Sequence, residues 1–214
     1  MRKRNILTAA ISLSLVACLS IGATLAYFTD KSETQTNVFT SGLVDITLVD
    51  ESPVNSEHTD WVIGTKSDEG ISYTDVFPGT TASKKVGVNV AADSSDAYVA
   101  IRVGFDVFLP YGDALLTSMA EQDLLDKLDE SIYPNWTGVV DSENECVYFY
   151  YNDPVSAGAE LTLFDHIEVP AEWGNDHADM NFTIAVQAAA IQADNMSLGQ
   201  FMAMDWDSLA TLNR

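Results

Sequence analysis

The chain has 214 residues, and its 32 acidic and 10 basic side chains give a formal net charge of −22. This excess of negative charge excludes a protein that binds nucleic acid or an anionic membrane surface by neutralising phosphates. With 47% hydrophobic and 20% charged residues, the chain is neither disordered nor collagen-like, and its length suits one packed domain.

Residues 1–26 have the pattern of an export signal. Three basic residues precede an uncharged run over residues 6–25, as in secretory signal peptides. Thr24 and Ala26 supply the small side chains that a signal peptidase requires, so we expect the mature chain to begin at Tyr27. The protein is then secreted, to the extracellular matrix or to the cell surface.

Two other outcomes stay open for this segment. Cys18 ends the sequence Leu-Val-Ala-Cys, which would serve as a lipobox and lead to acylation of that cysteine. The residues that follow Cys18 are apolar, however, whereas a lipidated terminus usually continues into a polar tether. The uncharged run is also just long enough to span a bilayer if it is not cleaved. Membrane contact is therefore expected only through this segment.

The sequence contains two cysteines, Cys18 and Cys146, and the first is lost on cleavage before Tyr27. The mature chain then has no partner for an intramolecular disulfide. Cys146 begins the sequence Cys-Val-Tyr-Phe-Tyr-Tyr, which is rich in residues that favour strands. A buried, unreactive thiol is predicted there rather than a nucleophile.

Along the rest of the chain, apolar residues alternate with polar ones, which predicts half-buried β-strands. The clearest run is residues 99–107, where five apolar side chains share one face. The expected strands are residues 44–48, 86–90, 99–107, 146–151, 160–169 and 180–193, and residues 51–70 are expected to form a long loop. Since all six prolines fall between these strands, the pattern indicates an all-β domain.

Two segments have helical periodicity instead. Residues 113–128 are expected to form an amphipathic helix inserted between strands, and a short helix is expected near the C-terminus. The apolar stripe of the first helix consists of Leu116, Ala120, Leu124 and Leu128. The stripe of the second consists of Leu198, Phe201, Met202, Trp206 and Leu209. Both stripes are expected to pack on the sheets.

Two motifs stand near the start of the chain: residues 22–30 read Gly-Ala-Thr-Leu-Ala-Tyr-Phe-Thr-Asp, and residues 38–46 read Val-Phe-Thr-Ser-Gly-Leu-Val-Asp-Ile. Both motifs resemble the start of the TasA/camelysin family of exported bacterial proteins. Residues 148–152 and 190–196 are similar to later parts of the same family. The sequence departs from the family pattern at Asn195, where the family usually has glycine, and in the inserted helix.

The resemblance implies a jelly-roll-like β-sandwich, export through a dedicated signal peptidase of the SipW type, and assembly into extracellular fibres of a biofilm matrix. The expected organisation is a signal peptide over residues 1–26, an extended N-terminal segment over residues 27–39, and a sandwich domain over residues 40–214. The expected partner is a second copy of the chain, with a minor anchoring or nucleating subunit as a further candidate. No nucleic acid partner is expected.

Residues 27–39 are a candidate donor strand, because an extended terminus can pair with the open edge of a sheet in a neighbouring molecule. Phe28 and Phe39 would anchor it in apolar gaps. The residues expected to take part in assembly are Tyr27, Phe28, Thr29, Asp30 and Phe39. The alternative, that this segment is the first strand of its own domain, stays open.

Two other classes of function stay open for this sequence. A monomeric surface adhesin, held at the membrane by the N-terminal segment, is the main alternative. A zinc endopeptidase is a more remote one, since some relatives of camelysin are described as such. It would need three ligands and a base, but His58, His166 and His177 show no ligand spacing, and the Asp176–Asp179 stretch is typical of a solvated loop. No catalytic residue, metal or cofactor is expected.

Overall fold

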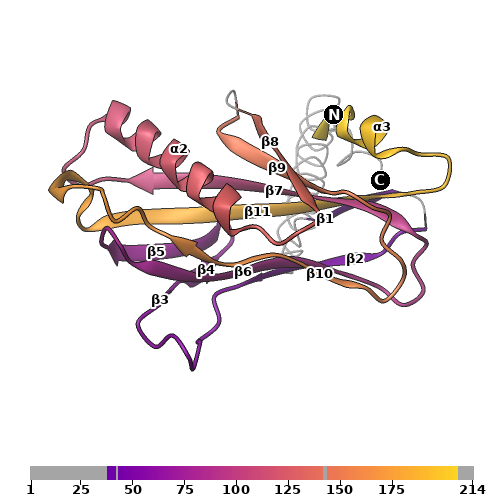
Figure 1. Cartoon of the computed structure of the whole chain (residues 1–214), viewed down its shortest axis with the longest axis horizontal. Helices are drawn as coiled ribbons and strands as arrows, with labels where there is room; N and C mark the ends of the chain where they lie inside the picture. Colours follow the sequence, from indigo (N-terminus) through magenta and orange to yellow (C-terminus); the bar gives the residue numbers. More distant parts are fainter. Residues whose placement is uncertain (1–37, 42, 142–143, 207–214) are drawn as a thin grey trace, which may run out of the picture. The chain divides into compact units, whose positions relative to one another are not determined.

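The computed structural model describes residues 38–41, 43–141 and 144–206. By its internal contacts the chain divides into two units, residues 1–35 and 36–214, and every described residue belongs to the second. The expected signal peptide, its cleavage site, Cys18 and residues 27–37 of the candidate donor lie outside the described residues. The described part is a sandwich of two β-sheets with two α-helices (Figure 1), which confirms the predicted fold class.

The larger sheet has seven strands, and its longest strand, β11, pairs with β7 along nearly its whole length. The order across this sheet is β4 (Thr65–Ser67), β5 (Gly70–Val76), β11 (Met180–Gln192), β7 (Ala97–Phe108), β9 (Cys146–Tyr151) and β8 (Trp136–Asp141). The remaining strand, β1 (Val38–Ser41), pairs with β11 in parallel. All other pairs in this sheet are antiparallel.

The smaller sheet lies beneath the larger one (Figure 1) and has four strands. Its order is β10 (Glu160–Glu168), β6 (Thr81–Val90) and β2 (Ile46–Glu51), and the short β3 (Val62–Ile63) pairs with β6 in parallel. A 3-10 turn, η1 (Asn175–His177), precedes β11. The apolar faces of the two sheets meet in one continuous core, as in other aligned sandwiches.

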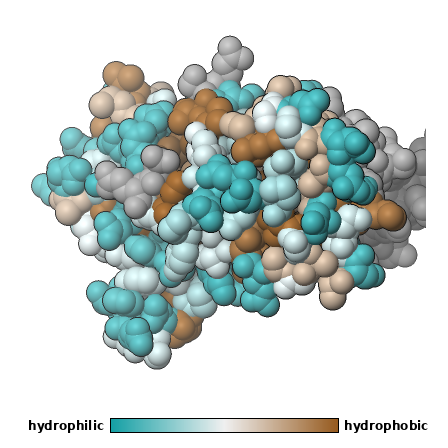
Figure 2. All heavy atoms as spheres, turned by 45° about the vertical axis from the view of Figure 1, so that its right-hand side comes forward, coloured by the Kyte–Doolittle hydropathy of each residue, from teal (hydrophilic) through white to brown (hydrophobic). Residues whose placement is uncertain are grey.

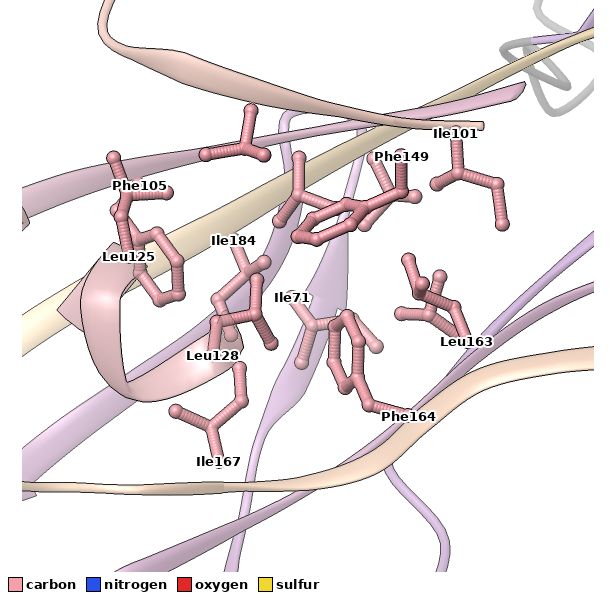
Figure 3. Close-up of a cluster of buried hydrophobic side chains, with 14 of the residues drawn as sticks. Ile71, Ile101, Phe105, Leu125, Leu128, Phe149, Leu163, Phe164, Ile167 and Ile184 are labelled. Atoms are coloured by element: carbon pink, nitrogen blue, oxygen red, sulfur yellow. The ribbon is translucent and has the colours of Figure 1, made fainter. Parts of the chain in front are cut away.

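The inserted helix α2 (Ala114–Ser131) contacts both β7 and β10, so it bridges the two sheets. It begins after Asp113, whose carboxylate accepts a hydrogen bond from the Leu116 backbone N–H at 2.9 Å, which is the usual N-cap arrangement. Leu125 and Leu128 turn toward the cluster that contains Phe105 (Figure 3). The predicted amphipathic helix is confirmed, and its leucines complete the core.

The short helix α3 (Leu198–Met202) covers the outer face of the larger sheet. Ser197 and Gln200 form a capping box at its start. Phe201 is fully buried, and its ring lies 5.6 Å, centroid to centroid, from that of Tyr150. The predicted C-terminal helix is confirmed, although Leu209 of its expected stripe lies outside the described residues.

A small polar cluster interrupts the apolar core between β5 and β6. The Tyr73 hydroxyl donates a hydrogen bond to the Ser83 carbonyl oxygen at 2.7 Å, although the ring is almost wholly buried. Burial raises the pKa of Tyr73 well above its usual value, and the nearby Asp50 carboxylate adds to the effect. Tyr73 therefore stays protonated in the folded protein at pH values where an exposed tyrosine ionises.

We expect the free energy of unfolding to fall as the pH rises above about 10, with a contribution from Tyr73 of about 1.4 kcal/mol per pH unit. The unfolded chain releases this proton near the ordinary pKa of 10.0, whereas the folded chain keeps it, so alkaline pH favours unfolding. Urea unfolding at several pH values above 9 (about one pH unit apart) measures the slope. Tyr73→Phe should show a shallower slope, and Tyr111→Phe, at an exposed position, should match the parent. Equal slopes in all three proteins would contradict this assignment.

Candidate functional site

The strands at the edges of the two sheets are the places where another chain could pair. In the larger sheet β8 ends the strand order on one side, and in the smaller sheet β10 and β2 end it on either side. A second kind of edge occurs along β11, where the side not paired with β7 is shared by β5 and β1. This shared edge is the one that the N-terminal end of the described chain occupies.

The pairing of β1 with β11 is short and parallel. In the backbone register Val38 is paired with Ala188 and Ser41 with Ile191, so the ladder extends over four residues. β5 pairs antiparallel with the same edge of β11, but nearer the N-terminal end of β11, between Met180 and Ile184. Within its own chain, β1 therefore acts as an added strand. This pairing corresponds to the intrachain alternative for residues 38–41 of the candidate donor, including the backbone of Phe39.

The segment of β11 that receives β1 is covered on both faces. Ala188 and Ala190 belong to the core between the sheets, whereas Ala189 and Ile191 belong to a second cluster beneath α3 that includes Phe201. Burial on both faces removes the alternation of polar and apolar residues, which explains the alanine run in the sequence. The edge of β11 thus lies between the core and the C-terminal helix.

The β8 edge is more exposed. Trp136 is buried, but Val139 and Val140 are 41% and 56% exposed. Together with Tyr148, Met204 and other side chains near the end of α3, these valines line a shallow groove on the outer face of the larger sheet. Sequence analysis did not identify β8, because it buries few side chains and so lacks the alternating pattern of a half-buried strand.

The three histidines lie in two separate places. His58 and Trp61 are in the loop between β2 and β3, which projects from the smaller sheet and is largely hydrophilic (Figures 1 and 2). The Trp61 ring lies between those of His58 and His166, at centroid distances of 4.5 and 5.1 Å. The stacked rings therefore hold the loop between β2 and β3 against β10, which contains His166.

The neighbouring Asp165 supports this stack. Its carboxylate lies 2.7 Å from His166 Nδ1 and accepts a hydrogen bond from the Tyr133 hydroxyl at 3.1 Å. Although partial burial acts in the opposite direction, these two contacts lower the pKa of Asp165 below its usual range. Asp165 therefore remains a carboxylate and orients the His166 ring.

His177 lies apart from this stack, at the end of η1. Its ring is 4.4 Å from that of Trp173 and nearly parallel to it. The side chain is buried, and its Nδ1 has no hydrogen-bond partner within the described part of the chain. The residues considered for an endopeptidase site are thus not brought together. Among the described residues, no group of three His, Cys, Asp or Glu side chains could hold a metal ion.

Cys146 is buried in β9, as predicted, and it is paired with a cation rather than exposed to solvent. The Arg102 Nε–H donates a hydrogen bond to its sulfur at 3.2 Å, and Arg102 Nη1 donates to the Gln187 side-chain oxygen at 3.2 Å. The strand predicted over residues 146–151 is also confirmed. The contacts of Cys146 are consistent with a structural role.

A buried ion pair was not found by sequence analysis. Lys84 in β6 is fully buried and contacts the carboxylate of Asp50 in β2. The signal was present in the sequence, because Lys84 lies in step with the apolar positions Val86 and Val88 of an alternating strand. A lysine at a core position of that pattern indicates either a buried partner or a special role.

None of the helices within residues 38–41, 43–141 and 144–206 is long and apolar enough to cross a membrane. Comparisons with models of protein families, with curated proteins and with solved structures find no match to the chain.

Proposed function

We propose that this protein is a secreted structural subunit that assembles into extracellular fibres of a biofilm matrix. In this proposal the N-terminal segment of one copy adds a strand to the sheet of the next copy. The observation that carries it is the position of β1, a short strand added to the shared edge of β11 by the N-terminal end of the described chain. The same ladder can form between two molecules if the N-terminal segment is exchanged.

The geometry of β1 favours such an exchange. β1 pairs with β11 over four residues only, whereas β7, on the other side of β11, pairs with it along all twelve of its residues. A short edge strand contributes little to the stability of its own domain, so little free energy is lost when an equivalent strand from another copy replaces it. Exchange in one direction along a row of molecules produces a filament unless the rotation closes a ring.

The partners in this proposal are other copies of the chain, with a minor subunit that anchors or nucleates the fibre. A dedicated signal peptidase of the SipW type would release the N-terminal segment during export. A subunit of this kind requires no catalytic residue, metal or cofactor. The resemblance of the N-terminal motifs to the TasA/camelysin family supports the proposal independently of the β1 geometry.

The test combines N-terminal sequencing of the exported protein with electron microscopy of the culture surface. A mature chain that begins at Tyr27, together with fibres that an antibody to this protein labels, is the expected result. An acylated Cys18 or an intact N-terminus, with monomers only, would overturn it and would favour the membrane-held adhesin. Peptidase activity that is lost in His177→Ala would overturn it in favour of the endopeptidase.

A further inference from the structure

The pair formed by Lys84 and Asp50 lies between adjacent strands of the smaller sheet. Asp50 is directly opposite Val86 in the antiparallel ladder of β2 and β6, and Lys84 is two residues before Val86 on the same face. The two side chains are therefore diagonal neighbours on the face that packs against the larger sheet. Lys84 Nζ contacts Asp50 Oδ1.

The surroundings of this pair exclude most of the solvent. The Lys84 side chain is fully buried, and that of Asp50 is 11% exposed. Apolar neighbours on the same face of β6, such as Ala82 and Val86, are also fully buried. Two charges in such a place lose the hydration that stabilises them in water, so the ionised pair is costly.

Burial has a chemical consequence for the lysine. Although the Asp50 carboxylate opposes the effect, burial lowers the pKa of Lys84 to about 8, and the nearby Lys66 ammonium acts in the same direction. The uncharged amine is the nucleophilic form of lysine, and it is then present near neutral pH. Transfer of one proton within the pair converts the two ions into a neutral amine beside a neutral carboxylic acid.

We propose that Lys84 and Asp50 react to form an intramolecular amide bond that joins β6 to β2. The Nζ lone pair attacks Asp50 Cγ, an Nζ–Cγ bond forms, and the bond from Cγ to one carboxyl oxygen breaks. That oxygen leaves as water with two protons from the original ammonium group. The reaction neither oxidises nor reduces any group and needs no co-reactant, because ammonium and carboxylate together contain every atom of the amide and the water.

Three features of the site favour this condensation. The sheet register holds the Lys84 amine beside the Asp50 carboxyl group, so the reaction avoids the entropy cost of a bimolecular encounter. The neutral product removes two buried charges at once. The bond would also fix β2, which is an edge strand of the smaller sheet, by closing the chain between residues 50 and 84 covalently. A chain with only two cysteines, Cys18 and Cys146, has no comparable disulfide available there.

Intact mass spectrometry of the purified protein tests this inference directly. The expected mass is lower by one water molecule than the mass calculated from the sequence and the measured N-terminus. Trypsin should fail to cleave after Lys84 and should release residues 32–66 joined to residues 67–85. An intact mass equal to the calculated one, with normal cleavage after Lys84, would overturn the proposal and leave a buried ion pair.

Two variants and a matched control sharpen the measurement. Asp50→Asn should form the same bond with loss of ammonia instead of water, so its product should have the same mass as the wild-type product. Lys84→Met should show no loss, whereas Lys85→Met, at the adjacent exposed position, should lose water as the parent does. If Lys84→Met fails to fold, the Asp50→Asn product alone decides the question. Loss of water that persists in Lys84→Met would assign the modification elsewhere and overturn the proposal.

Discussion

Deletion of residues 27–36 is expected to abolish filament formation while leaving a folded β-sandwich. The deletion removes most of the candidate donor segment but retains β1, whose first residue is Val38, and every later strand. Circular dichroism should show an unchanged β-sheet signal, and electron microscopy should show no filaments where the full mature chain forms them. The four-residue ladder of β1 that remains is too short to hold two copies together without the rest of the donor segment, so the loss of filaments should be close to complete.

A single substitution should have a similar effect. Phe28→Asp places a carboxylate where the donor needs an apolar anchor, and burying an unpaired charge costs several kcal/mol or more. Gln35→Asp is the control, since it adds the same charge at a polar residue of the same segment, which the donor-strand prediction leaves in solvent, unlike the apolar anchors Phe28 and Phe39. If the deletion variant unfolds, the segment belongs to its own domain. If it forms normal filaments, donor-strand addition is wrong.

The second large effect concerns the junction between α2 and the two sheets. Leu128→Ala should lower the free energy of unfolding by about 2–5 kcal/mol, because Leu128 is fully buried and its loss leaves a cavity in the core. Leu115→Ala removes the same side chain from the same helix at a position that is 70% exposed. Its effect should stay within about 0.5 kcal/mol.

Chemical denaturation with urea measures both variants. Similar free energies of unfolding for Leu115→Ala and Leu128→Ala would mean that α2 does not complete the core. A loss of filaments in Leu128→Ala without a loss of stability would instead place α2 in the contact between copies. The folding and assembly effects can therefore be separated with the same two proteins.

The sequence predicted those strands whose two faces have different environments. β7 and β9 were found with nearly correct bounds, because their inward residues are apolar. α2 was found for the analogous reason at helical spacing, and Asp113 marked its start. In each case the periodicity reports directly which side chains reach the core.

The strands that were missed, β3, β4, β5 and β8, lack this signal, and β3 and β4 lie within residues 51–70, where a long loop was expected. β5 begins with the expected alternation at Ile71 and Tyr73, but Asp75 adopts a positive φ of 54° and its pairing with β11 shifts by one residue, as at a β-bulge. β8 exposes most of its side chains at the edge of its sheet. Both features depend on pairing with distant strands, which periodicity within one segment does not report.

The candidate site was predictable only in part. The N-terminal segment was identified by its apolar residues and its motifs, but which edge receives it depends on sheet order, and sheet order was not fixed by the pattern. The Lys84–Asp50 pair required knowledge that β2 and β6 are neighbours with Asp50 opposite Val86. Contacts between residues far apart in sequence are therefore the information that only the structure supplied.

The shared edge of β11 limits how far an incoming strand can slide. Within the described part of the chain, β5 pairs with this edge as far as Ile184 and β1 begins opposite Ala188, so residues 185–187 form the interval between these two partners. The chain of β5 closely approaches this point, since a Cβ on Gly70 would lie 2.2 Å from the Ile184 carbonyl oxygen. A ladder in the register of β1 can thus be lengthened at its N-terminal side by about three residues before it meets β5, and the earlier residues of the donor segment would contact the neighbouring copy outside this ladder. This stop would give every junction in a filament the same depth of insertion, and hence a constant axial repeat.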